Sequence, residues 1–270
     1  MLIVALFSCE EVVIIDLPPE QNLLVVEGWV TDKVETQYVR LSRSNSFLGD
    51  PNPIIADAIV TVQQRNGNAQ TYSYSGDGFY FSDSPFAGEK DQEYRVNLVL
   101  ANGELIRSDW DKMQASTEII LLSIDNFDDN DPENPNQTKT FFFPRITALD
   151  SSNFDNYYRW VFYRNDVRVV EPESITLQND LFFDGNFIPN LFDSFEFEAE
   201  DEVKVELQSI TEETFDYLNL LKAQITTLGA AASTTPAIVN GNIFNVSNPD
   251  ETILGYFGTR AISLDSAIAR

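Results

Sequence analysis

Turn signals that divide short apolar runs are the feature of this sequence that most restricts its fold. Asn66-Gly67 lies between two such runs, and Asn102-Gly103 lies between two more. The Asn-Gly dipeptide favours the tight turns that join antiparallel strands. Between these two positions, Gly76-Asp77-Gly78 separates a further pair of runs. A chain divided in this way is predicted to form β-hairpins.

The first part of the chain contains several of these short strands. They recur at spacings of about 8 to 12 residues, which is typical of β-sandwiches. The clearest are "LLVVEGWVTD" from Leu23 and "TQYVRLSRS" from Thr36. We therefore predict a sandwich domain over residues 22–112, which follows a tether over residues 1–21 where a Pro-Pro pair excludes a helix.

The rest of the chain, residues 113–270, is predicted to form a second β-rich domain with one helix. Its strands are rich in aromatic residues, as in "NYYRWVFY". Around residues 210–228 apolar side chains recur every three or four positions, which predicts an amphipathic helix on one end or face of the sheet. Ser209 and Glu212 fit a capping box at its start, and Gly229 fits its end. The apolar stripe consists of Phe215, Leu218, Leu221, Ile225 and Leu228.

The predicted fold class is therefore mainly β. It combines an N-terminal β-sandwich of the immunoglobulin-like kind with a second β-rich domain that carries one amphipathic helix.

The composition excludes several classes of function. The chain carries 43 Asp and Glu against 17 Lys and Arg, for a formal net charge of −26. Nucleic-acid binding needs clustered basic residues, so no nucleic-acid partner is expected. The chain has no His and one Cys, which removes the usual general base, the usual zinc ligands and any internal disulfide. We expect no cofactor and no catalytic residue; any chemistry would depend on carboxylates, Lys, Tyr or calcium.

The acidic segment Asp125–Asn136 is the best candidate for a metal site. Calcium takes about six to eight oxygen ligands, which carboxylates supply well. The segment lacks the Gly and the distal Glu of an EF-hand, and no predicted helix flanks it, so a solvated loop is the alternative interpretation. The weak calcium candidates are Asp125, Asp128, Asp129, Asp131 and Glu133.

Two further patterns have both a functional and a structural interpretation. Glu196 and Glu198 could form a glycosidase pair, but their alternation with two Phe predicts an amphipathic strand with a solvated acidic face. An aromatic cluster could stack on a carbohydrate, but it occupies both faces of its strand, which favours packing in a core. The cluster consists of Tyr157, Tyr158, Trp160, Phe162 and Tyr163.

The single Cys indicates where the protein resides. The apolar run "MLIVALFSC" ends with Leu6, Phe7, Ser8 and Cys9. This order matches the lipobox of bacterial lipoprotein signal peptides, in which a small residue precedes the Cys that is acylated. The run is short and has no preceding Lys or Arg, so we expect the natural start to lie a few residues upstream. Acyl chains on Cys9 would anchor the mature protein in a membrane; the alternative is a small buried Cys on a first strand.

Several stretches, in order, resemble an uncharacterised family, the domain of unknown function 4249 lipoproteins of Bacteroidota. From Cys9 to about Ala261 they are "LLVVEGWVTD", "YVRLSRS", "ADAIVTV", "GFYF", "EYRVNLVLANGELIRSD", "NYYRWVFY" and "NPDETILGYFG". The resemblance implies an outer-membrane lipoprotein without an established activity, often encoded beside a TonB-dependent receptor. It also implies that the N-terminal β-sandwich is transthyretin-like. The acidic residues after Cys9 loosely resemble a surface-export signal, which leaves the membrane leaflet open.

These observations together predict a non-enzymatic, lipid-anchored protein of the outer membrane, on its cell-surface or periplasmic face. It would dock on a TonB-dependent receptor and help capture or take up the receptor's ligand. The alternatives are a free-standing adhesin that binds glycans or proteins and, less favoured, a carboxylate-based hydrolase.

Overall fold

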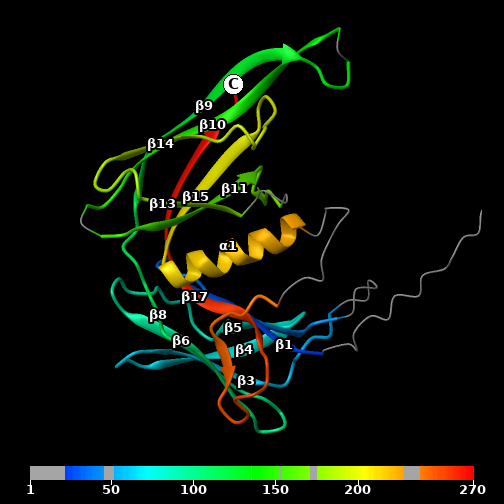
Figure 1. The fold of residues 1–270 in the computed structure, drawn as a ribbon, viewed down its shortest axis with the longest axis vertical. Helices are drawn as coiled ribbons and strands as arrows, with labels where there is room; N and C mark the ends of the chain where they lie inside the picture. The colour runs from blue at the N-terminus through cyan, green and yellow to red at the C-terminus, as the bar shows by residue number, and fades with distance from the viewer. Residues whose placement is uncertain (1–21, 46–51, 135, 153, 171–174, 228–237) are drawn as a thin grey trace, which may run out of the picture.

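The computed structural model describes residues 22–45, 52–134, 136–152, 154–170, 175–227 and 238–270. Cys9, the tether and Gly229 lie outside the described residues. The described chain is mainly β with one helix, as predicted. Its strands form one sheet of 14 strands and one of three strands (Figure 1).

The predicted turns of the N-terminal part are confirmed. Asn66-Gly67 joins β3 to β4, Gly76-Asp77-Gly78 joins β4 to β5, and Asn102-Gly103 joins β6 to β7. Asn66 and Gly103 adopt positive φ values of 61° and 88°, as such turns require. The strands are β1 (Leu24–Thr31), β2 (Tyr38–Arg43), β3 (Ile59–Gln64), β4 (Ala69–Gly76), β5 (Phe79–Ser82), β6 (Glu93–Val99), β7 (Leu105–Ser108) and β8 (Asp111–Lys112).

These strands curl around a first apolar core. Neighbours in the sheet order β1-β2-β5-β4-β3-β6-β7 all contribute buried side chains to the same cluster. Val26, Val39, Val60 and Val96 are completely buried there. Because successive side chains of a strand point to opposite faces, every second residue of β6 is buried. The alternation in the sequence therefore selects the face that packs inward.

A second core lies between two layers of strands. The sheet β14-β10-β9 covers strands β11, β15 and β17 of the large sheet, with Trp160 and Phe162 packed near Ile146 in one cluster. The remaining elements are β9 (Glu118–Asn130), β10 (Thr138–Leu149), β11 (Tyr157–Arg164), β12 (Val167–Arg168), β13 (Thr176–Asn179), β14 (Phe187–Leu191), β15 (Glu202–Ile210), α1 (Glu212–Thr227), β16 (Ile243–Asn245) and β17 (Leu254–Ile268).

The segment around Glu196 has two buried Phe side chains and a more exposed acidic face, as predicted, but it is not a full strand. Phe195 and Phe197 belong to the second core, and Glu196 forms an ion pair with Lys139 (2.8 Å). Pairing is limited to one bridge between Phe197 and β10. The chain then turns at Glu200, whose φ is 70°, so the extended pairing that the alternation predicts does not develop.

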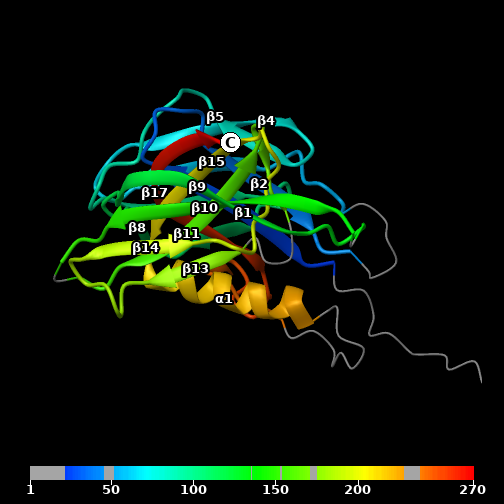
Figure 2. The ribbon, with the colours of Figure 1, turned by 90° about the horizontal axis from the view of Figure 1, so that it is seen from above.

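Helix α1 lies along one side of the sandwich, beside β13 (Figure 2). Phe215, Leu218 and Leu221 pack in a small third cluster, as predicted, whereas Ile225 is 39% exposed. Among the described residues, no helix combines the length and the apolar character needed to cross a membrane.

The predicted capping box of α1 is wrong. The helix is capped by Thr211, whose Oγ1 accepts the N–H of Thr214 (3.3 Å). Ser209 still belongs to β15, where its extended backbone pairs with β17, and its Oγ accepts the N–H of Thr117 (3.2 Å). The pairing with β17 keeps the chain extended until Ile210, so the helix cannot be capped two residues earlier.

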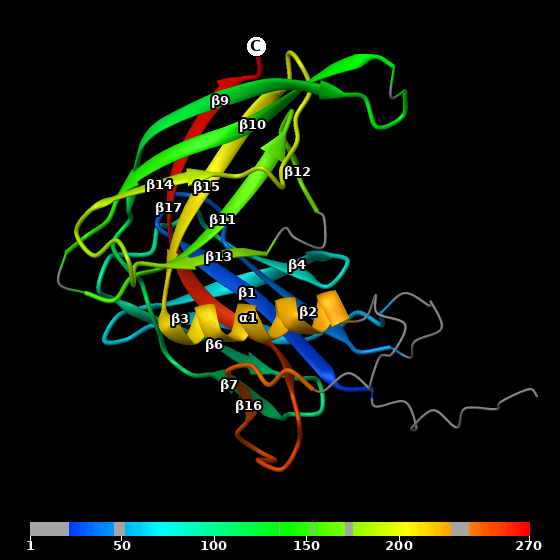
Figure 3. The same cartoon turned by 45° about the horizontal axis from the view of Figure 1, so that its top comes forward.

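Strand β17 belongs to both halves of the molecule (Figure 3). Residues 254–260 pair in parallel with β1, and residues 261–268 pair in antiparallel fashion with β15. In addition, β16 pairs with β7. The predicted boundary between residues 112 and 113 stays a prediction, and two C-terminal strands extend the N-terminal part across it.

Two carboxylates complete the hydrogen bonding of β17 where its partner strands change. Strand β15 pairs with β17 only from Ala261 onward. Just before this residue, Asp111 accepts the N–H (2.9 Å) and the hydroxyl (2.6 Å) of Thr259. Strand β1 ends at Thr31, and the next residue, Asp32, accepts the N–H of Ile262 (2.9 Å).

The second oxygen of Asp111 receives hydroxyl groups from the start of the helix and from β17. These are Thr211 (3.0 Å), Thr214 (3.1 Å) and Tyr256 (3.3 Å). Asp111 is only 4% exposed. Burial raises the pKa of this carboxyl, and the hydrogen bonds from Thr259 and Thr211 act in the opposite direction. The side chain therefore connects β8, β17 and α1 inside the protein.

We expect Asp111→Ala to lower the free energy of unfolding by about 3 kcal/mol, because it leaves several buried donors without their acceptor. The matched control is Asp109→Ala, two residues away, whose side chain is exposed; it should change stability by less than about 0.5 kcal/mol. Urea unfolding of both variants measures the difference, and equal effects would contradict the role of Asp111.

A second prediction concerns the parallel pairing of β1 with β17. Gly255 has a φ of +98°, and a Cβ there would lie 2.0 Å from the carbonyl oxygen of Val26. Gly76 has a similar φ of +110° but open space around it. Gly76→Ala should cost about 1 to 2 kcal/mol of stability from backbone strain alone. Gly255→Ala should cost clearly more in the same unfolding experiment, and a smaller cost would contradict the close approach.

Candidate functional site

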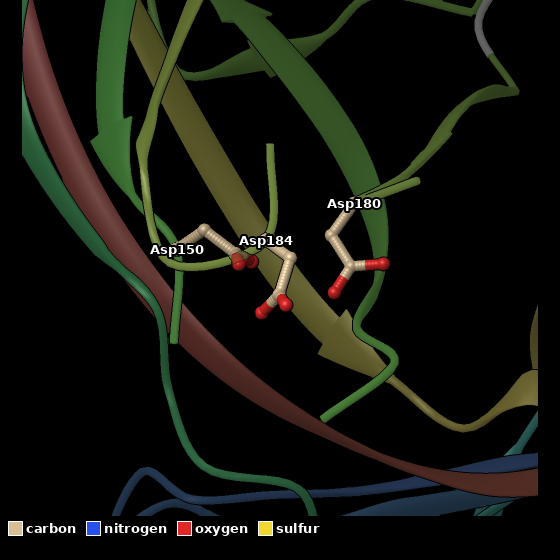
Figure 4. Close-up of side chains that lie close together, drawn as sticks. All are labelled: Asp150, Asp180 and Asp184. Atoms are coloured by element: carbon tan, nitrogen blue, oxygen red, sulfur yellow. The ribbon is translucent and has the colours of Figure 1, made fainter. Parts of the chain in front are cut away.

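Three carboxylates converge at one end of the second core (Figure 4). Asp150 follows β10, and Asp180 and Asp184 lie in the connection between β13 and β14. One oxygen from each lies within 4.8 Å of the others. Within the part of the chain that the structure describes, no other group of three potential ligands meets this distance.

Asp150 and Asp180 are held by hydrogen bonds within the fold. Asp150 accepts the hydroxyl of Tyr158 and the N–H of Gly185 (2.8 Å). Asp180 accepts the backbone N–H (2.9 Å) and the side-chain amide (3.2 Å) of Asn156. Both carboxylates are buried. Burial, with the hydrogen bond to Asp150 second, raises the pKa of Tyr158, so its hydroxyl stays protonated and donates. These contacts hold the ends of β10, β11 and β13 together.

An open hollow of about 520 Å³ lies beside Asp180 and Asp184 and is also lined by Phe154, Asp155 and Leu181. One converging oxygen from each carboxylate gives three ligands. Calcium takes about six to eight, so a cation here would also need second carboxylate oxygens, water or backbone carbonyls. The hydrogen bonds of Asp150 and Asp180 indicate a loop-ordering role for these carboxylates at the ends of β10, β11 and β13.

The predicted calcium candidates lie on the β9–β10 hairpin. Strand β9 continues to Asn130, so the turn is shorter than the predicted loop. Asp125 lies 2.5 Å from Arg145 in an ion pair, and Asp131 accepts the N–H of Glu133 (2.9 Å). The structure does not bring three of the five candidates within metal-ligating distance of one another. Calcium binding at this hairpin stays a prediction.

The predicted aromatic cluster is divided between two faces of β11. Tyr158, Trp160 and Phe162 are buried in the second core, which confirms core packing for that face. Tyr157 packs against Phe215 of the helix, on the opposite face. Tyr163 shares that opposite face, where an unexpected group of polar side chains surrounds it.

This polar group lies on the face of the large sheet that points away from both cores. The strand register places Arg159 of β11 beside Gln208 of β15, and Arg260 of β17 follows on the same face. Arg159 is 8% exposed and Gln208 is 1% exposed. The Nε atoms of Arg159 and Arg260 and the Oε1 atom of Gln208 are buried without a hydrogen-bond partner among the described residues.

One acidic residue on this face accepts hydrogen bonds from neutral side chains. Glu206 accepts the hydroxyl of Tyr163 (2.8 Å) and the side-chain amide of Gln208 (2.7 Å). It therefore forms no direct ion pair with an arginine in the described chain. Burial, together with the charges of Arg168 and Arg260, lowers the pKa of Arg159 to about 10.

Aromatic rings from the N-terminal part extend the same face. The Arg260 guanidinium lies 5.5 Å from the ring centre of Trp29. Tyr38 contacts Phe79 and Phe81 at 5.7 and 6.5 Å between ring centres, and Phe81 is 36% exposed. We call this surface the arginine face; it comprises Trp29, Tyr38, Arg159, Tyr163, Glu206, Gln208 and Arg260.

No pattern in the sequence predicts the arginine face. The local signal was an arginine in the middle of an otherwise apolar strand, since Arg159 interrupts "YYRWVFY". Its neighbours Gln208 and Arg260 come from strands that are distant in the sequence, so only the strand register brings them together.

The chain matches a model of a protein family. A family model described as "Domain of unknown function (DUF4249)" matches residues 10–263, nearly the whole chain. No curated protein matches this chain.

The loop-ordering role of Asp150 predicts the effect of removing one hydroxyl. Tyr158→Phe should lower the free energy of unfolding by about 1 to 3 kcal/mol, because buried Asp150 then loses a donor. Tyr74→Phe is the matched control, since Tyr74 is exposed, and should change stability by less than about 0.5 kcal/mol. Chemical unfolding compares the two; if Tyr158→Phe were as mild as its control, the contact would not be structural.

Proposed function

The chain belongs to the DUF4249 family, whose description assigns no activity, and on that premise we propose that it is a non-enzymatic lipoprotein of the outer membrane. In this role it helps a TonB-dependent receptor capture or take up a ligand. The observation that carries the proposal is the arginine face. Guanidinium groups, an amide and aromatic rings are groups that hold ligands, and here they lie together on one sheet face.

The lipobox at Cys9 supports the membrane anchor. Residues 10–23 separate Cys9 from β1, and an extended chain of that length spans about 45 to 50 Å. A tether of this reach would hold the folded part clear of the lipid headgroups. The formal net charge of −26 fits such an arrangement, because a strongly acidic surface is repelled by anionic headgroups.

A free-standing adhesin is the second candidate. Tyr38, Phe79 and Phe81 form a cluster of rings at the margin of the arginine face. Partly exposed rings of this kind can stack on the apolar faces of sugars. This cluster would bind a glycan without any receptor, which separates the two roles experimentally.

The hydrolase alternative has weaker support. It would depend on convergent acids in a cleft, and the group formed by Asp150, Asp180 and Asp184 has two members engaged in buried hydrogen bonds. We therefore do not develop it further.

Pull-down from detergent-solubilised outer membranes tests the proposal. The chain is expressed from an upstream start codon with a C-terminal tag, as wild type and as Cys9→Ala. Wild type should carry acyl mass on its N-terminal Cys and bring a TonB-dependent receptor with it, whereas Cys9→Ala should lose the acyl mass and leave the membrane fraction.

Two results would contradict this account. A free thiol on Cys9 would remove the anchor, and repeated purification without a receptor would remove the accessory role. Binding of the purified chain to a sugar array, abolished by Phe81→Ala, would instead favour the adhesin.

A further inference from the structure

We infer that the arginine face binds a small anion that carries a carboxylate or phosphate group and a hydroxyl, held by Arg159, Gln208 and Arg260. The inference rests on the proposed function in one respect: it names the ligand class for the same face. Its evidence is the side-chain geometry, which does not depend on any receptor.

Among the residues that the structure describes, buried polar atoms without a hydrogen-bond partner are concentrated on the arginine face. Buried polar atoms in proteins are nearly always hydrogen-bonded, so each exception calls for an explanation. Three of the five exceptions in the described chain lie on this face, on the adjacent strands β11, β15 and β17. Arg159 and Gln208, which carry two of them, are both more than nine-tenths buried.

These atoms comprise two donors and one acceptor. The Nε atoms of Arg159 and Arg260 are donors and need an acceptor, whereas Gln208 Oε1 is an acceptor and needs a donor. A carboxylate or phosphate oxygen satisfies the two guanidinium groups. A hydroxyl on the same molecule satisfies the amide oxygen. One small hydroxylated anion therefore meets all three requirements.

The arginine face also carries a local concentration of positive charge. Positively charged side chains are scarce in this chain, with 17 against 43 acidic ones, yet three arginines lie near one another here. Burial lowers the pKa of Arg159, and the like charges of Arg168 and Arg260 lower it further. Glu206 on the same face is hydrogen-bonded to Tyr163 and Gln208. An incoming anion would offset these like charges.

The margin of the arginine face is partly exposed to solvent. Arg168 is exposed, and Arg260 and Trp29 are half-buried. The ring of Trp29 lies against the Arg260 guanidinium, so a ligand held by Arg260 would lie near this indole. Tryptophan fluorescence is therefore a direct report on occupancy.

The test titrates the full chain with two organic anions and with inorganic phosphate, at constant ionic strength set with chloride. Citrate carries carboxylates and a hydroxyl, and tricarballylate is the same molecule without the hydroxyl. We expect citrate to raise Tm and to change the fluorescence in a saturable way. Tricarballylate should bind at least about tenfold more weakly, because Gln208 Oε1 then stays unpaired. The phosphate titration shows whether that group can replace a carboxylate.

Substitutions test which residues bind the anion. Arg159→Leu and Arg260→Gln should each weaken citrate binding at least about tenfold, and Trp29→Phe should remove the fluorescence change while keeping the Tm shift. The matched control is Arg65→Gln, because Arg65 also lies over a tryptophan, Trp110, but is paired with Glu93. It should bind citrate as the wild type does.

Arg159→Leu also separates loss of binding from loss of folding. Replacing a buried, unpaired charge with an apolar side chain should leave Tm in anion-free buffer equal to or above that of the wild type. A lower Tm would mean that the guanidinium supports the fold, and would overturn the inference.

Two further outcomes would also overturn it: no saturable response to citrate or phosphate, or equal responses in the arginine-face variants and Arg65→Gln. Equal affinity for citrate and tricarballylate would overturn the part assigned to Gln208. These results decide whether the arginine face holds an anion, and the pull-down decides separately whether the chain associates with a receptor.

Discussion

The rest of the structure depends on strand β17, which exchanges one partner strand for another halfway along its length. At that point its backbone N–H groups need acceptors that neither β1 nor β15 supplies, and buried N–H groups without acceptors are costly. Asp111 and Asp32 provide those acceptors from opposite edges. The strand can then serve both cores: Phe257 belongs to the first, and Ala267 packs against the second.

This continuity explains how a binding surface arises from two separate parts of the chain. Because β17 joins β1 to β15, the face opposite the cores continues from the N-terminal strands to the C-terminal ones. Trp29 from the first part thereby lies beside Arg260, and Arg159 and Gln208 from the second part follow on neighbouring strands. The proposed role in ligand capture depends on this shared face.

Local patterns predict much of the fold but little of the site. The Asn-Gly turns and the alternation of β6 follow from neighbouring residues, and so does the helix, although pairing with β17 moves its cap to Thr211. Asp111 could not be foreseen, because its partner Thr259 lies 148 residues away. The acidic segment shows the converse: acids adjacent in sequence are spread along a hairpin, whereas Asp150 and Asp180 meet only through the fold. Lipidation of Cys9 stays a prediction.

The central claim is that both parts of the chain form one anion-binding face, and diffraction tests it most directly. Crystals of the full chain soaked in selenate, a tetrahedral oxyanion with an anomalous signal, would locate the anion in a difference map. The account predicts a peak between the guanidinium groups of Arg159 and Arg260, within hydrogen-bond distance of both. A map with peaks only elsewhere, or a carboxylate of the chain itself in that position, would contradict it.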